Sequence, residues 1–84
     1  MGNDQIPTEE IIQDISDTLV EIKQMEREEQ GLRIIGDRMS LFRADARVNG
    51  IRERKVFVSK LESILKEREQ QALSQLDQIA GGEG

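Results

Sequence analysis

The 84-residue chain carries 12 basic and 17 acidic residues, so its formal net charge is −5, and only 36% of its residues are hydrophobic. That length allows one small domain, whose own core supplies little stability. The chain has no His and no Cys, which excludes the commonest general base, thiol nucleophiles, disulfides and the best zinc ligands. We therefore expect no enzymatic activity, no cofactor and no small-molecule substrate.

Carboxylates are the only side chains from which a metal site could be built. The di-iron bundle signature needs a His three residues after a Glu, and no His exists here. We expect solvated ion pairs rather than a metal ion at the acidic residues Glu26, Glu28, Glu29, Glu67 and Glu69.

No apolar run approaches the length of a membrane span, and the first residues lack the basic and apolar regions of a signal peptide. These features predict a soluble chain that does not enter membranes. We expect a cytoplasmic or otherwise intracellular location.

A first helix is predicted to begin at Thr8, which we expect to be its N-cap, after a disordered lead-in over residues 1–7. Two glutamates follow in the first turn, where carboxylates favour the helix dipole. Apolar residues then recur every three or four positions, which places them on one helical face. They are Ile12, Ile15, Leu19, Ile22 and Met25.

Two glycines make the next segment ambiguous, because each costs a helix interior about 1 kcal/mol relative to Ala. We favour a continuous or gently kinked helix through Gly31 and Gly36. The alternatives are a break with Asp37 capping a second, short helix, and a short strand over residues 32–35. The continuous helix is favoured because the apolar spacing keeps its phase through both glycines, at Leu32, Ile35, Met39 and Phe42.

The pair Asn49–Gly50 is the strongest turn signal, since both residues tolerate positive φ. We predict an all-α fold: an antiparallel, coiled-coil-like two-helix hairpin over residues 8–80, turning at 49–50, with a flexible tail at 81–84. The apolar face of its second helix would comprise Val58, Leu61, Leu65, Ala72, Leu76 and Ile79, with Phe57, Ile64 and Leu73 beside them.

This turn would set the pairing between the helices. It would bring Phe42 opposite Phe57, and Ile22 opposite Leu76. It would also bring the polar segment 26–30 beside the polar segment 66–71, a hydrophilic waist that fixes the register. In that waist Glu28 and Glu29 would face Arg68 or Lys66.

An isolated hairpin buries only one stripe per helix. Burial supplies about 25 cal/mol per Å², while ordering costs about 1.5 kcal/mol per residue, so the balance falls near zero. We therefore expect a homodimeric four-helix bundle, or docking on another helical protein. The predicted interface is Ile12, Ile15, Leu19, Ile22, Leu32, Ile35, Met39, Phe42, Phe57, Leu61, Ile64, Leu65, Leu76 and Ile79.

The basic stretch over residues 43–60 supports an alternative function, which is contact with nucleic-acid phosphates at the hairpin tip. Only Phe57 is near enough in sequence for base stacking, and the acidic net charge disfavours non-specific affinity. These cations could instead pair with neighbouring acids or with the acidic N-terminal half of a second chain. The candidate contacts are Arg43, Arg47, Arg52, Arg54 and Lys55.

The sequence thus predicts a non-enzymatic protein–protein interaction module, structural, adaptor or chaperone-like in role. The alternative is a small nucleic-acid-binding or regulatory protein. A third possibility is a one-to-one complex with an unrelated protein, in which the uncomplexed chain is partly molten.

Overall fold

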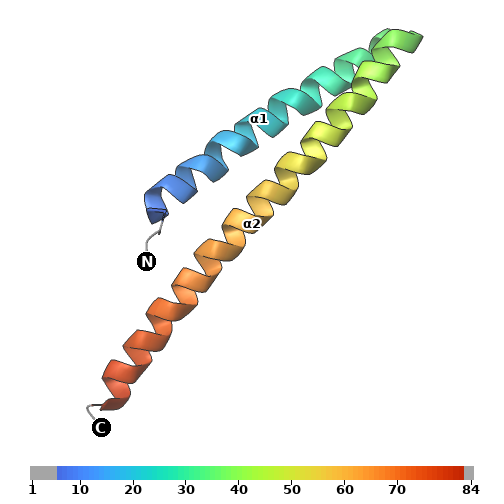
Figure 1. The fold of residues 1–84 in the computed structure, drawn as a ribbon. Coiled ribbons are helices and arrows are strands. Elements are labelled where there is room, and N and C mark those ends of the chain that lie inside the picture. The colour runs from blue at the N-terminus through green and yellow to red at the C-terminus, as the bar shows by residue number, and fades with distance from the viewer. Residues whose placement is uncertain (1–5, 83–84) are drawn as a thin grey trace.

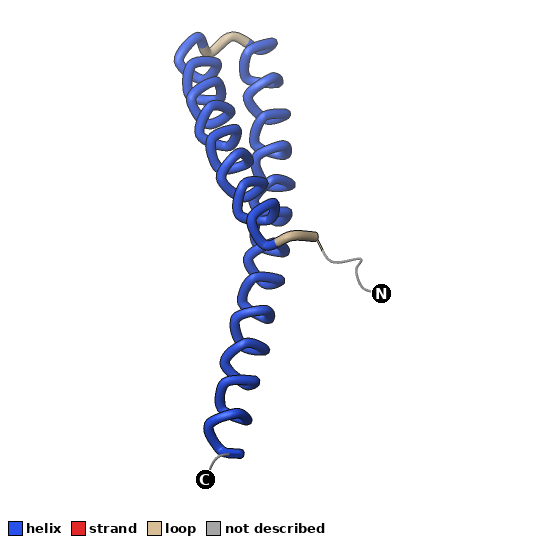
Figure 2. Tube along the Cα trace, turned by 90° about the vertical axis from the view of Figure 1, so that its left-hand side faces the viewer, coloured by secondary structure: helices blue, strands red, loops and turns tan. Residues whose placement is uncertain are grey.

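A computed structural model of the chain describes residues 6–82, which form two helices, α1 (Thr8–Ile35) and α2 (Arg38–Gly82). The helices run antiparallel and pack against each other as a hairpin (Figures 1 and 2). The predicted all-α hairpin is therefore confirmed. The predicted lead-in and tail lie partly outside the described residues, and Gly82 still belongs to α2.

The start of α1 differs from the expected one by a residue. Pro7 precedes the helix, and its carbonyl accepts hydrogen bonds from the backbone N–H of Glu10 at 3.0 Å and of Ile11 at 3.1 Å. Thr8 is the first helical residue and not a side-chain cap. Glu9 and Glu10 occupy the first turn, as their charge favours.

The chain reverses at Gly36, and not at residues 49–50 as predicted. Gly36 has φ 76°, the left-handed conformation that ends α1, and its N–H donates to the carbonyl of Leu32 at 3.1 Å. Asp37 then caps α2, because its Oδ1 accepts a 2.7 Å hydrogen bond from the N–H of Ser40. This bond holds the pKa of the Asp37 carboxyl below its usual value of 3.8.

Gly31 and Gly50 lie within helices, as do Gly81 and Gly82 near the C-terminus. Gly31 lies inside α1, so the prediction of a continuous helix is confirmed at Gly31. The same prediction is wrong at Gly36, where α1 ends. The alternative with Asp37 as a cap is right about the break and wrong about a short second helix, since α2 has 45 residues. Residues 32–35 are helical, which excludes the strand.

Gly50 lies in α2 where it faces α1, and this explains its presence there. A Cβ atom at Gly50 would come within 2.7 Å of the Met25 Cε. The glycine therefore leaves room for the end of the Met25 side chain and does not make a turn.

The turn at Gly36 sets a register different from the expected one. Ile22 packs with Ile51 and Val58, and Ile15 and Met25 pack against this cluster. The predicted pairings of Phe42 with Phe57 and of Ile22 with Leu76 are therefore wrong.

The packed positions in both helices repeat at alternating steps of three and four residues, the spacing of a coiled-coil seam. The seam of α1 comprises Ile11, Ile15, Thr18, Ile22, Met25, Glu29 and Leu32, and that of α2 comprises Ser40, Ala44, Arg47, Ile51, Arg54, Val58, Leu61, Leu65 and Arg68.

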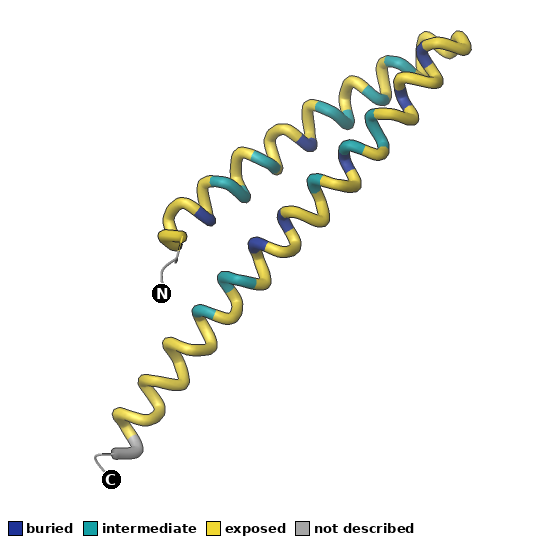
Figure 3. The backbone as a smooth tube through the Cα atoms, in the orientation of Figure 1, coloured by how far each residue is buried: buried dark blue, intermediate teal, exposed yellow. Residues whose placement is uncertain are grey.

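The two helices differ in length, with 28 residues in α1 and 45 in α2. The pairing ends near Thr8, whose hydroxyl accepts a 2.9 Å hydrogen bond from Arg68. Beyond that point α2 continues alone and every residue from 69 to 80 is exposed (Figure 3). The radius of gyration is 19.7 Å, against about 12 Å for a compact domain of this length. The hairpin is therefore elongated and α1 covers only part of α2.

We predict opposite effects when alanine replaces Gly31 and Gly36. Gly36→Ala forces a Cβ into the left-handed region and should lower the free energy of unfolding by about 1–2 kcal/mol. Gly31→Ala, which has no neighbouring atom within 4 Å, should raise it by about 1 kcal/mol. Urea denaturation followed by circular dichroism measures both, and equal effects at the two positions would contradict the location of the turn.

Candidate functional site

The hairpin presents two kinds of surface, one near the turn and one at the far end of α2. Near the turn, charged side chains of α1 and α2 pair across the seam. At the far end, apolar side chains of α2 are exposed without a covering helix. Both surfaces are candidate interaction sites.

Acidic residues of α1 pair with basic residues of α2 along the covered part. The Nε of Arg47 lies 2.9 Å from the Oε1 of Glu28, and the Nε of Arg54 lies 3.1 Å from the Oε1 of Glu21. All these groups are partly exposed, so water screens them and they contribute more to register than to stability. A further pair joins Lys55 and Glu26 at 3.6 Å.

A small network next to the turn completes this charged surface. Arg33 lies 2.6 Å from Glu29 on its own helix and 3.3 Å from Asp45 on α2. The hydrogen bond that Arg33 donates to the Glu29 carboxylate holds the pKa of the Arg33 guanidinium above its ordinary value. Segment 26–30 thus faces residues 45–55, and the predicted waist between 26–30 and 66–71 is wrong.

Three of the five cations predicted to contact nucleic acid therefore lie in ion pairs within the hairpin: Arg47, Arg54 and Lys55. Only Arg43 and Arg52 have no ion-pair partner among residues 6–82. Moreover the five lie along α2 and not at its tip, since the turn is at Gly36. The geometry does not gather them into one basic patch, and nucleic-acid contact stays a prediction.

The predicted interface residues divide into three groups by exposure. Ile22 and Leu61 are buried in the seam, while Ile15, Leu32, Ile64 and Leu65 are half-buried beside it. The remaining eight are exposed on the hairpin and thus accessible to a second chain. They are Ile12, Leu19, Ile35, Met39, Phe42, Phe57, Leu76 and Ile79.

The covered core contains residues that the sequence prediction left out. Ile11 and Ala44 are completely buried, and Ile51 is 7% exposed. Ile11 lies four residues before Ile15 and so continues the seam spacing. The sequence therefore contains a signal for the burial of Ile11. Ala44 and Ser40 are small, and their burial depends on the position of the turn, which the spacing does not reveal.

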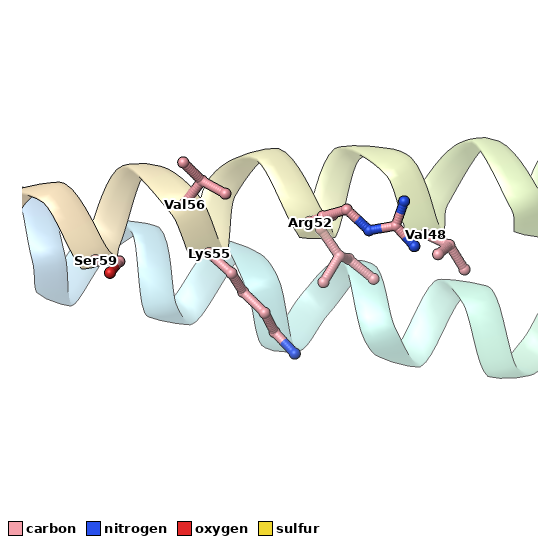
Figure 4. Close-up of a pocket in the computed structure, with 6 residues that line it drawn as sticks. Val48, Arg52, Lys55, Val56 and Ser59 are labelled. Carbon is pink, nitrogen blue, oxygen red and sulfur yellow. The ribbon is translucent and has the colours of Figure 1, made fainter.

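A shallow groove of about 420 Å³ runs along α2 beside the seam. Figure 4 shows five of its six lining residues with labels, and Lys55 extends from α2 across toward α1, where it pairs with Glu26. A second hollow follows further along the same helix, lined by Glu62, Leu65, Lys66 and Glu69. The first groove is lined by Val48, Ile51, Arg52, Lys55, Val56 and Ser59.

No three carboxylates among the described residues lie close enough together to hold a metal ion. Neither α1 nor α2, over residues 6–82, contains an apolar stretch that could cross a membrane. Comparison with protein-family models, with curated proteins and with solved structures gives no match. Function must therefore be argued from the exposed surfaces themselves.

We predict that apolar truncation separates the seam from the exposed surface. Ile22→Ala removes a side chain that is 4% exposed, and it should lower the free energy of unfolding by about 2–5 kcal/mol. Ile34→Ala is the matched control at a position 85% exposed, and it should change that free energy by less than about 0.5 kcal/mol. Urea denaturation at a fixed protein concentration measures both, and a larger loss for Ile34→Ala would contradict the observed register.

Proposed function

We propose that this chain is a non-enzymatic protein–protein interaction module that self-associates into a homodimeric bundle of four helices. The observation that supports this proposal is the uncovered end of α2. Leu73, Leu76 and Ile79 lie there with exposed fractions of 56%, 61% and 64%. Three large aliphatic side chains on one uncovered stretch are a costly surface for a monomer and a suitable one for an interface.

The total surface supports the same conclusion. The chain exposes 6675 Å², whereas a folded monomer of 9.6 kDa exposes about 5,100 Å². The excess, about 1,600 Å², falls within the range that each partner loses in an obligate homodimer. Self-association would bring the exposed surface to a value typical of a folded protein.

The seam of the single hairpin is a weak core, which favours assembly further. Polar and charged residues, among them Thr18, Glu29 and Arg47, occupy several seam positions. Each reduces the apolar area that the two helices bury between them. A second copy would add the missing apolar contacts, as in dimeric four-helix bundles.

We further propose a structural, adaptor or chaperone-like role inside the cell. Small secreted domains depend on disulfides, and this chain has no Cys. Nucleic-acid binding is less well supported, because the net charge is −5 and most of the candidate cations pair with α1.

Size-exclusion chromatography with light scattering tests the proposal. We expect the native chain to elute with twice its 9.6 kDa mass and without absorbance at 260 nm. Leu76→Lys, which places a cation among the exposed aliphatic side chains, should shift the protein to the monomer. Gln78→Lys adds the same charge on the opposite side of α2 and should leave the dimer intact.

A monomeric native chain at every concentration would contradict self-association. A peak that carries nucleic acid would instead support the alternative function. Equal effects of the two substitutions would show that charge, and not the apolar surface, controls assembly.

A further inference from the structure

We infer that the second copy lies antiparallel along α2, with the twofold axis at the level of residue 64, between Glu62 and Lys66. The contact surface is a stripe of α2, defined as the residues at alternating steps of four and three from Val48 to Ala80. This inference rests on the proposed self-association and specifies its geometry. Both hollows of α2 lie on this stripe, and its C-terminal part belongs to the uncovered end.

The stripe has the spacing that a helix needs to pack along another helix. Its first half contains Val48, Arg52, Lys55 and Ser59, all of which line the first groove. At 100° per residue the stripe lies about a quarter turn around α2 from the seam that binds α1. Two contact faces a quarter turn apart are what a helix presents to its two neighbours in a four-helix bundle.

The two halves of the stripe differ in charge. The half nearer the turn carries Arg52, Lys55 and Glu62, whereas the far half carries Lys66 and Glu69 and lies beside Asp77. The far half also supplies the exposed Leu73 and Leu76. An antiparallel second copy places Arg52 opposite Leu76 and Lys55 opposite Leu73. The aliphatic stems of these cations then cover the leucines, and their charged ends lie within a helical turn of Asp77 and Glu69 of the other copy.

The centre of the stripe is self-complementary about a twofold axis. Glu62 and Lys66 line the second hollow together with Leu65. Neither charged residue has an ion-pair partner in the described part of the chain. In the antiparallel arrangement Glu62 of each copy meets Lys66 of the other, so two identical ion pairs flank the axis, as an isologous interface requires.

A parallel arrangement fails on the same residues. It would place Arg52, Lys55, Glu62, Lys66 and Glu69 each opposite its own copy. Like charges at successive layers oppose association. Leu73 and Leu76 would gain apolar contacts with their own copies, but five layers of like charges would oppose association. The charge pattern therefore favours the antiparallel dimer.

Cysteine cross-linking tests this geometry, and the native chain has no Cys to interfere. The antiparallel register places Ser59 of one copy opposite Glu69 of the other. We expect an equimolar mixture of Ser59→Cys and Glu69→Cys chains to form disulfide-linked heterodimers as the main product on mild oxidation. Intact mass spectrometry distinguishes heterodimers from homodimers, since the two variants differ in mass.

Each variant alone is the control. Two copies of residue 59 lie about 15 Å apart along the axis in this dimer, too far for a disulfide. Efficient Ser59→Cys homodimers would show a parallel dimer and overturn the inference. A dimer by light scattering that forms no disulfide in the mixture would overturn it as well, while leaving self-association intact. If both variants and the native chain are monomeric, the proposed function itself fails.

Discussion

The unequal lengths of the two helices are the constraint on which the rest of the structure depends. Because Gly36 reverses the chain well before its middle, a helix of 28 residues must cover one of 45. The apolar residues of α2 that α1 reaches become a core. Those beyond Arg68, including Leu73 and Leu76, stay on the surface with the same chemical character. The exposed apolar end of α2, on which the proposed self-association rests, is thus a consequence of where the turn lies.

The covered part is specified more by fit and charge than by a large core. Ser40 and Ala44 are buried beside the turn, so small residues allow the helices to approach there, and Gly50 leaves room for the end of the Met25 side chain. Further along, carboxylates of α1 meet cations of α2, as in the pair of Glu28 and Arg47. Such pairs favour one alignment of the two helices over alignments shifted along the seam, although they add little to the free energy of unfolding.

The sequence predicts the helices and the hairpin because both follow from local patterns. The apolar spacing and the turn residues are sufficient for that level of description. It does not locate the turn, because Gly31, Gly36 and Gly50 are each compatible with a helix end. Only packing distinguishes them: Gly50 faces Met25, and Gly31 faces solvent. The Asp37 carboxylate beside the Ser40 N–H was the local signal for the correct break.

The wrong turn also explains the errors at the site. With residues recurring every three or four positions, a helix pair can be aligned in several registers that all match apolar with apolar. The predicted register matched Ile22 with Leu76, whereas Ile22 packs on Ile51. Leu76 is exposed instead, because the short α1 does not reach it, which the spacing alone does not show.

Hydrogen–deuterium exchange of residues 69–80, measured over a range of protein concentrations, tests most directly whether a second copy covers the end of α2. A helix end without a partner opens readily and exchanges quickly. The account predicts that protection of this segment rises with concentration toward that of the seam around Ile51. Fast exchange of residues 69–80 at every concentration, with the seam protected throughout, would contradict it.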